Sequence, residues 1–225
     1  ANTRVGTSAA GSVSGKLFKP DFVWVKARSL SAGHRLFNSI SGAEKALYSN
    51  VTNAETIETG SLTAFNADGF SFGADSNQGV NLSGASYVDW LFKAGGAGIA
   101  NNSGTVASTV SVNNEAGISL MAWSGSGANN ATVGHGLNEA PKFGLVKGKT
   151  AGDEWPVFHS SLAAANNLYL HLTNAQNAVS GVTQGGIGAV SSSTITCSIG
   201  TNLNNTNASG HNYIGLFFVE KYGFS

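Results

Sequence analysis

Charge is scarce in this sequence. Charged residues make up 11% of the 225 residues, against roughly a quarter in ordinary soluble domains, and 12 basic residues balance 12 acidic ones. Neither sign clusters along the chain. Because a phosphate backbone or an anionic bilayer is held by a basic surface, we expect neither nucleic acid nor a membrane as a partner.

Cysteine and long apolar runs are almost missing as well. The single Cys197 excludes an internal disulfide framework and a cysteine-based metal site. No run of 18 consecutive apolar residues occurs, which speaks against a membrane-spanning helix. Residues 1–15 are small and polar, without the regions of a signal peptide, so we expect a mature or trimmed chain.

Motifs that carry chemistry are absent too. The sequence has no Gly-rich phosphate loop, zinc-binding histidine pair, EF-hand loop or nucleophile elbow. The histidines lie far apart, and we expect solvated or capping roles for His34, His135, His159, His171 and His211. The sequence therefore predicts no catalytic residue, no metal site and no cofactor.

What the sequence does contain is a repeat. The stretch PDFVWVK at 20–26 returns 121 residues later as PKFGLVK at 141–147. From position 20 to 55, 12 of 36 aligned pairs are identical, where composition alone gives roughly three. Further along, 87–92 matches 213–218 at an offset of 126. These matches predict two tandem units related by internal duplication.

The repeat also sets the expected boundaries. We predict a first unit at 1–96 and a second at 97–225, joined by a linker at 95–98 that extends through 100–104. The change of offset places about five extra residues of the second unit in a loop around 181–193.

The first unit looks incomplete. The apolar stretches 105–112 and 118–123 precede the repeat in the second unit, and the first unit could match them only upstream of Ala1. An incomplete β unit leaves an open sheet edge, and such edges are usually covered. We therefore expect a neighbouring chain or upstream sequence to cover the first unit.

Local patterns favour strands. Residues alternate between apolar and polar in several segments, as in half-buried strands: 106–112, 168–172, 194–199, and 70–72 after the turn signal 66–69. Continuous apolar runs at 22–25 and 213–218 predict central strands. The best helix candidates, 42–47 and 160–165, span one or two turns. We predict an all-β fold of two tandem β-sandwich units, jelly-roll-like, with barrels left open as an alternative.

A few acidic residues could serve glycoside hydrolysis, which uses paired carboxylates. Asp89, Asp153, Glu154 and Glu139 lie near predicted strand ends. Asp89 stands out because it lies inside an apolar strand, beside Trp90. We favour an outward-facing Asp89 on a half-buried strand over a functional acid.

Aromatic rings beside amides and hydroxyls are typical of sugar-binding faces, since rings stack on pyranoses. Trp123, Trp155, Tyr169 and Tyr213 are the candidates for such stacking. Most of them also fit as core residues.

The repeated segments resemble a known family. Several motifs are similar to the repeated β domain of tail-fibre and other virion surface proteins of marine tailed bacteriophages, cyanophages included. They are TVGHGL at 132–137 followed by PKF at 141–143, FVWVKARS at 22–29, FNADGF at 65–70 and YVDWLFKAGG at 87–96. The second unit departs from this pattern at Gly144 and lacks a clear Asp-Gly-Phe equivalent.

The resemblance implies a non-enzymatic virion structural protein, either a tail fibre or a capsid decoration. Its partners would be other virion proteins, copies of itself and a host-surface glycan, and its location the surface of the particle. A carbohydrate-binding module and a polysaccharide depolymerase acting through Asp89 or Asp153 are the alternatives.

Overall fold

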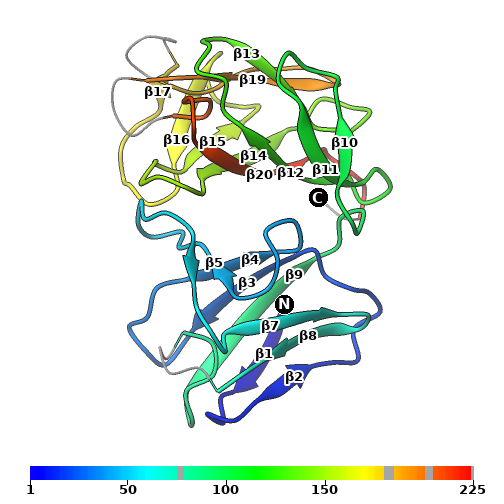
Figure 1. The fold of residues 1–225 in the computed structure, drawn as a ribbon, viewed down its shortest axis with the longest axis vertical. Coiled ribbons are helices and arrows are strands. Elements are labelled where there is room, and N and C mark those ends of the chain that lie inside the picture. Colours follow the sequence, from blue (N-terminus) through cyan, green and yellow to red (C-terminus); the bar gives the residue numbers. More distant parts are fainter. Residues whose placement is uncertain (75–78, 180–184, 201–204, 224–225) are drawn as a thin grey trace. The chain divides into compact units, whose positions relative to one another are not determined.

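The computed structural model describes residues 1–74, 79–179, 185–200 and 205–223 (Figure 1). These residues form β-strands and no helix, which confirms the predicted all-β fold. There is accordingly no helix in these ranges that could span a membrane. The chain divides into two compact units: unit 1 has residues 1–50 and 55–96, and unit 2 has residues 51–54 and 97–225.

Unit 1 contains two main sheets and a short hairpin. The larger sheet has the strand order β1-β9-β3-β4, the smaller one has the order β2-β8-β7, and β5 pairs with β6. The strands are β1 (Asn2–Val5), β2 (Gly11–Val13), β3 (Phe22–Ala27), β4 (Arg35–Asn38), β5 (Lys45–Ala46), β6 (Thr56–Ile57), β7 (Leu62–Asn66), β8 (Gly69–Phe72) and β9 (Ser86–Phe92).

Unit 2 also contains two sheets. The larger one has the order β10-β11-β12-β20-β14-β15-β16-β17 and the smaller one has the order β13-β19-β18. The strands are β10 (Ile99–Asn101), β11 (Ser108–Asn113), β12 (Ile118–Ser124), β13 (Ala131–Gly134), β14 (Phe143–Gly148), β15 (Pro156–His159), β16 (Asn166–Tyr169), β17 (Asn177–Ala178), β18 (Gly186–Val190), β19 (Thr194–Ser198) and β20 (Asn212–Phe218).

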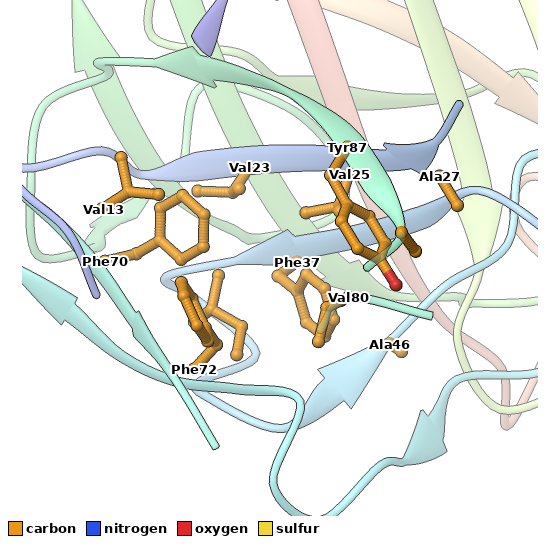
Figure 2. Close-up of a cluster of buried hydrophobic side chains, with 12 residues drawn as sticks. Val13, Val23, Val25, Ala27, Phe37, Ala46, Phe70, Phe72, Val80 and Tyr87 are labelled. Carbon is orange, nitrogen blue, oxygen red and sulfur yellow. The ribbon is translucent and has the colours of Figure 1, made fainter. Parts of the chain in front are cut away.

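An apolar core separates the two main sheets of unit 1. Along β3, Val23 and Val25 are buried on one face, as the period-2 geometry of a strand requires. The opposite sheet contributes Phe70 and Phe72 of β8, and Figure 2 shows these side chains pointing toward those of β3. Two antiparallel sheets packed face to face in this way form a β-sandwich.

The core of unit 2 is built in the same way. Val146 and Phe217 come from the larger sheet, and Ile195 and Cys197 come from β19 in the smaller one. The predicted alternation is confirmed along 194–197, because Ile195 and Cys197 are buried while Thr196 is only half-buried. It does not extend to 199, since Ser198 is buried and Ile199 is half-buried. The predicted central position of the runs at 22–25 and 213–218 is confirmed as well, since β3 and β20 each have a neighbour on both sides.

The two units share their strand order. The order β1-β9-β3-β4 in unit 1 corresponds to β12-β20-β14-β15 in unit 2, and β2-β8-β7 corresponds to β13-β19-β18. The register agrees too. Phe22 pairs with Phe92 in unit 1, and Phe143 pairs with Phe218 in unit 2, which are the pairs that the offsets of 121 and 126 equate.

Hydrogen bonds in the turns also correspond. After β1, the Asn81 Oδ1 accepts a hydrogen bond of 3.0 Å from the backbone N–H of Thr7. After β12, the Asn207 Oδ1 accepts one of 3.0 Å from the backbone N–H of Ser126. Both asparagines are buried. A buried amide that satisfies backbone groups fixes the path of the chain at the same place in each unit.

The units differ at one sheet edge. In unit 2, β12 pairs with β11 on its outer side, and β11 pairs with β10. In unit 1, no described strand lies outside β1. The expectation that unit 1 could match 118–123 only upstream of Ala1 is wrong for 121–123, because β1 pairs with β9 in the register with which this part of β12 pairs with β20. Only β10 and β11 have no counterpart there.

The two predicted helices are wrong. Residues 160–165 form turns and bends, and the stretch 42–47 is a turn followed by β5. Glu44 has a φ of 62° and Ala165 a φ of 54°, and this left-handed conformation interrupts an α-helix.

Three further sequence predictions need correction or fall outside the described residues. β10 overlaps the predicted linker extension at 100–104, because it runs from Ile99 to Asn101. The strand expected at 168–172 ends at Tyr169, and Leu168, Leu170 and Leu172 are each at least 36% exposed. The loop predicted around 181–193 is wrong for 186–190, which form β18, and its residues 181–184 lie outside the described residues.

Candidate functional site

The aromatic candidates on β12 and β20 lie in the core of unit 2. Trp123 and Tyr213 stack on each other with ring centroids 5.4 Å apart. The Trp123 Nε1–H donates to the Thr206 carbonyl at 3.0 Å, and the Tyr213 hydroxyl accepts from the Ala208 N–H at 2.9 Å. Burial raises the pKa of Tyr213 well above its usual range. Both rings are therefore engaged inside the protein.

The other two aromatic candidates are buried as well. Trp155 precedes β15 and donates through Nε1 to the Val51 carbonyl at 3.1 Å. Tyr169 is 6% exposed. The structure thus corrects the prediction that Trp123, Trp155, Tyr169 and Tyr213 stack on a glycan, because no face of a buried ring is open to a sugar.

Asp89 points into the core of unit 1 and is fully buried. Its Oδ2 accepts from Arg4 Nε at 2.9 Å, and its Oδ1 accepts from Arg4 Nη2 at 3.2 Å. Asn2 Nδ2 adds a third hydrogen bond of 3.2 Å. The expectation of an outward-facing Asp89 is wrong, since the alternation of β9 turns this side chain inward toward Arg4. Its two oxygens are held by structural partners, so it is a poor candidate for an acid that meets substrate.

Asp153 is also buried and engaged in unit 2. Its Oδ2 lies 3.0 Å from His211 Nδ1, and its Oδ1 accepts from Asn205 Nδ2 at 3.2 Å. The backbone carbonyl of Asp153 accepts from Lys147 Nζ at 2.6 Å. Burial lowers the pKa of Lys147 to about 8, and the nearby Asp153 charge partly opposes this. These contacts describe a structural polar cluster.

The two glutamates among the acid candidates have different surroundings. Glu139 is exposed and forms an ion pair with Lys221. Burial raises the pKa of Glu154, and its Oε2 is a buried atom with no hydrogen-bond partner. In the described part of the chain, no hydrogen bond links any two of the four acids.

The histidines have separate environments. His34 Nδ1 accepts from Trp24 Nε1 at 2.7 Å, and the N–H of Leu137 donates to His135 Nδ1 at 3.1 Å. Burial lowers the pKa of both His34 and His135. Across residues 1–74, 79–179, 185–200 and 205–223, no three His, Cys, Asp or Glu side chains form a cluster that could hold a metal ion.

A groove of about 590 Å³ lies on unit 2, which we call the unit 2 groove. Its lining comes from β10, β11, β12 and β20 and from nearby loops. The side chains are mainly small, amide or hydroxyl groups, with one lysine and two aromatic residues: Ala100, Asn102, Val106, Ala107, Ser108, Thr109, Ala122, Trp123, Ser124, Lys149, Asn212 and Tyr213. Such a lining offers hydrogen-bond donors and acceptors, but the rings of Trp123 and Tyr213 are buried in the core and offer no open face.

A family model described as a domain of unknown function, DUF7483, matches residues 1–225. The chain belongs to the DUF7483 family. No curated protein and no solved structure matches it significantly. The match covers both units.

Arg4, which in this DUF7483 member pairs with Asp89, was not among the residues predicted from the sequence. Its guanidinium lies 4.6 Å from the ring centres of both Phe72 and Tyr87. The strand register explains why Arg4 lies beside Tyr87, because the two residues pair across β1 and β9. In unit 2 the counterpart of Arg4, Trp123, pairs with Tyr213 in the same way. The short strand 2–5 shares no identical residue with 121–124, so the comparison of the two units gave no signal there.

A second missed feature is an aromatic pair on the other face of the larger sheet of unit 1. Trp24 of β3 pairs directly with Trp90 of β9, and their ring centroids are 6.2 Å apart. Trp90 is 37% exposed. The two tryptophans lie opposite each other because of the register between β3 and β9, which the sequence did not show.

Proposed function

We propose that the chain is a non-enzymatic structural protein of a bacteriophage virion surface, in a tail fibre or a capsid decoration. It works through assembly with other virion proteins and with copies of itself. The sequence resemblance motivates the phage setting, which stays a prediction.

The observation that carries the proposal is the agreement of the two units in strand order, register and turn hydrogen bonds. We infer that they derive from one ancestral unit by internal duplication. Repeated β units of this kind serve as building blocks of extended assemblies, where many weak contacts add up to strong attachment. The paired, buried state of Asp89 and Asp153 supports a non-catalytic role.

The test is to look for the chain in purified particles of the virus that encodes it. Mass spectrometry of washed particles should detect it at a stoichiometry above one copy, and electron cryomicroscopy should place its two units in a symmetric array. A chain absent from the particles, and monomeric at all concentrations, would contradict the proposal.

A carbohydrate-binding role is the second candidate, and the unit 2 groove favours it. Asn102, Ser124 and Asn212 offer amides and a hydroxyl to sugar hydroxyl groups. On a glycan array, binding that Asn102→Ala weakens and Asn174→Ala leaves unchanged would support this role. Asn174 is an exposed asparagine outside the groove.

A further inference from the structure

Two sheet edges of unit 1 border one groove. β1 is at the end of the larger sheet and β2 is at the end of the smaller sheet. A groove of about 490 Å³ is lined by both strands, the turn that joins them, Ser14 and Phe72. We call it the unit 1 groove. Unpaired strand edges offer backbone donors and acceptors to an added strand.

Unit 2 shows how the corresponding space is filled. β11 pairs along β12, the counterpart of β1. The residues just before β11 contact β13, the counterpart of β2. Val106 forms a β-bridge with Val133. The backbone N–H of Thr105 donates to the Thr132 hydroxyl and the backbone N–H of Thr132 donates to the Thr105 hydroxyl, each at 2.9 Å. One extended segment therefore ties together the edges of both sheets.

The side chains of this segment also complete the core. Val110 is buried in the core of unit 2, and Val106 and Val112 pack against that core. Ser108 is buried too, and its hydroxyl donates to the Gly134 carbonyl at 2.7 Å. Alternate residues of β11 thus supply small apolar and hydroxyl groups to the gap between the sheets.

Arg4 carries a hydrogen-bond donor that lacks an acceptor. Its Nε and Nη2 bind Asp89, but its Nη1 is buried and has no hydrogen-bond partner. Arg4 lines the unit 1 groove. Since buried donors are almost always paired in native proteins, an acceptor is missing at this place.

We propose that the unit 1 groove binds an extended peptide strand of a partner polypeptide, which joins β1 as β11 joins β12. Transferring the register of unit 2 puts the equivalent of Ser108 opposite Arg4 and the equivalent of Val110 opposite Asn2. The partner strand has β-branched apolar residues alternating with small hydroxyl residues, and it supplies the acceptor for Arg4.

A partner polypeptide fits this groove better than a second copy of the chain. The strand of this pattern within the chain, β11, is already paired on both sides, with β10 and with β12. It is not available to a neighbouring copy unless unit 2 gives it up. The inference goes beyond the proposed function and holds whether or not the chain belongs to a virion.

The test uses a labelled synthetic peptide with the sequence of residues 104–114, GTVASTVSVNN. Fluorescence anisotropy should show one peptide bound per chain. Hydrogen–deuterium exchange should show that the peptide protects the amides of residues 2–5 and 11–13. Protection there separates binding at unit 1 from exchange with the native β11 of unit 2.

Two matched pairs of variants locate the contact. In the peptide, the change equivalent to Val110→Asp should weaken binding by about tenfold or more, because it puts a charge on the buried face, while the change equivalent to Thr109→Asp should leave it nearly unchanged. In the protein, Ser12→Trp should block the groove, while Ser31→Trp, at an exposed serine outside its lining, should not.

Three outcomes would overturn the inference. One is no binding at about 1 mM peptide, where even a weak strand addition registers. Another is protection by the peptide outside residues 2–5 and 11–13. The third is protection of the β1 amides without any peptide. In a dimer identified by sedimentation, it would make a second copy the occupant, and in a monomer extended before Ala1 it would make upstream sequence the occupant.

Discussion

At the residue scale, the two units fill one position of the sandwich with different chemistry. In unit 1 this position holds Arg4, which is paired with Asp89 and enclosed by aromatic rings. In unit 2 the counterpart of Arg4 is Trp123, and the counterpart of Asp89 is Gly215. The buried ion pair of unit 1 and the indole of unit 2 thus fill the same space, beside Tyr87 in unit 1 and beside Tyr213 in unit 2.

Removing Arg4 should be costly. In Arg4→Met, the fully buried Asp89 loses its charged partner, and we expect the free energy of unfolding to fall by about 3 kcal/mol or more. The double variant Arg4→Met with Asp89→Leu should recover most of this loss, because no unpaired charge remains. Urea denaturation followed by tryptophan fluorescence measures both. A single variant within about 1 kcal/mol of the unmodified chain would show that the pair is not needed.

His135 should make stability depend on pH. Its Nδ1 accepts from the Leu137 N–H and its Nε2 contacts the Ser191 carbonyl, which fits the neutral ring, and burial lowers its pKa. The unfolded chain then binds the proton more readily than the folded chain. Stability is full above the unfolded pKa of about 6.5 and falls as the pH drops below it.

The measurement is a series of urea titrations between neutral and mildly acidic pH. In His135→Gln the fall in stability should be shallower than in the unmodified chain. His34 and His171, whose pKa values are also lowered by burial, contribute to the fall that remains. Equal slopes for the two proteins would contradict a role for His135.

Cys197 should not react in the folded protein. It is fully buried on β19, and burial raises its pKa to about 12, so the thiolate that reacts with disulfide reagents is almost unpopulated at neutral pH. A colorimetric disulfide reagent should label no thiol in native buffer and one thiol per chain in concentrated denaturant. Rapid native labelling would mean that the smaller sheet of unit 2 opens.

Residue identity alone did not reveal which candidates would be buried. Trp123 and Tyr213 fit both an exposed sugar-binding face and a core, and only the pairing of β12 with β20 decides between them. Asp89 looked outward-facing because its partner Arg4 lies 85 residues away in the sequence. A polar residue on the inner face of a strand becomes recognisable once its partner is known.

At the scale of single elements, glycines mark where the backbone passes closely. A Cβ on Gly6 would lie 2.1 Å from the Leu82 carbonyl oxygen, and a Cβ on Gly125 would lie 2.1 Å from the Ala208 carbonyl oxygen. These glycines occupy corresponding places after β1 and β12. No side chain fits there unless the backbone moves.

Gly125→Ala should therefore destabilise unit 2 by about 2 kcal/mol, because a backbone carbonyl has to shift. The matched control in the same unit is Gly152→Ala, where the nearest atom to the added Cβ is 3.6 Å away and little change is expected. Thermal unfolding of the two variants compares them directly. Similar losses in both would show that close approach is not the cause.

Strands were more predictable than helices for a physical reason. Alternation and apolar runs record which face of a strand is buried, and β3, β8, β19 and β20 follow those patterns. The predicted helices relied on short segments of good helix formers. Left-handed residues inside them, Glu44 and Ala165, depend on tertiary contacts that no local pattern shows.

At the scale of the whole molecule, balanced charge governs solubility. The formal net charge at pH 7 is zero, so chains do not repel each other there. We expect a minimum of solubility near pH 7 and higher solubility at pH values about two units to either side. Precipitation by polyethylene glycol across this range measures it. Solubility that is highest at neutral pH would mean that uncharged surface groups dominate.

The relation between the units was predictable only where side chains agree. The offsets read from the sequence equate the residue pairs that share a register in β3 with β9 and in β14 with β20. The match of β1 to β12 could not be predicted from the sequence, because the two strands share their backbone pairing but no identical residue between 2–5 and 121–124.

In each unit, the last described strand of the unit's larger sheet does not lie at its edge. β9 lies between β1 and β3, and β20 lies between β12 and β14. The ribosome therefore releases the two neighbouring strands before the central strand that pairs with both. Each larger sheet stays in two parts until this central strand is synthesised. A unit whose synthesis is nearly finished therefore still lacks a complete larger sheet. Folding of each unit waits for its final seven-residue strand, β9 in unit 1 and β20 in unit 2.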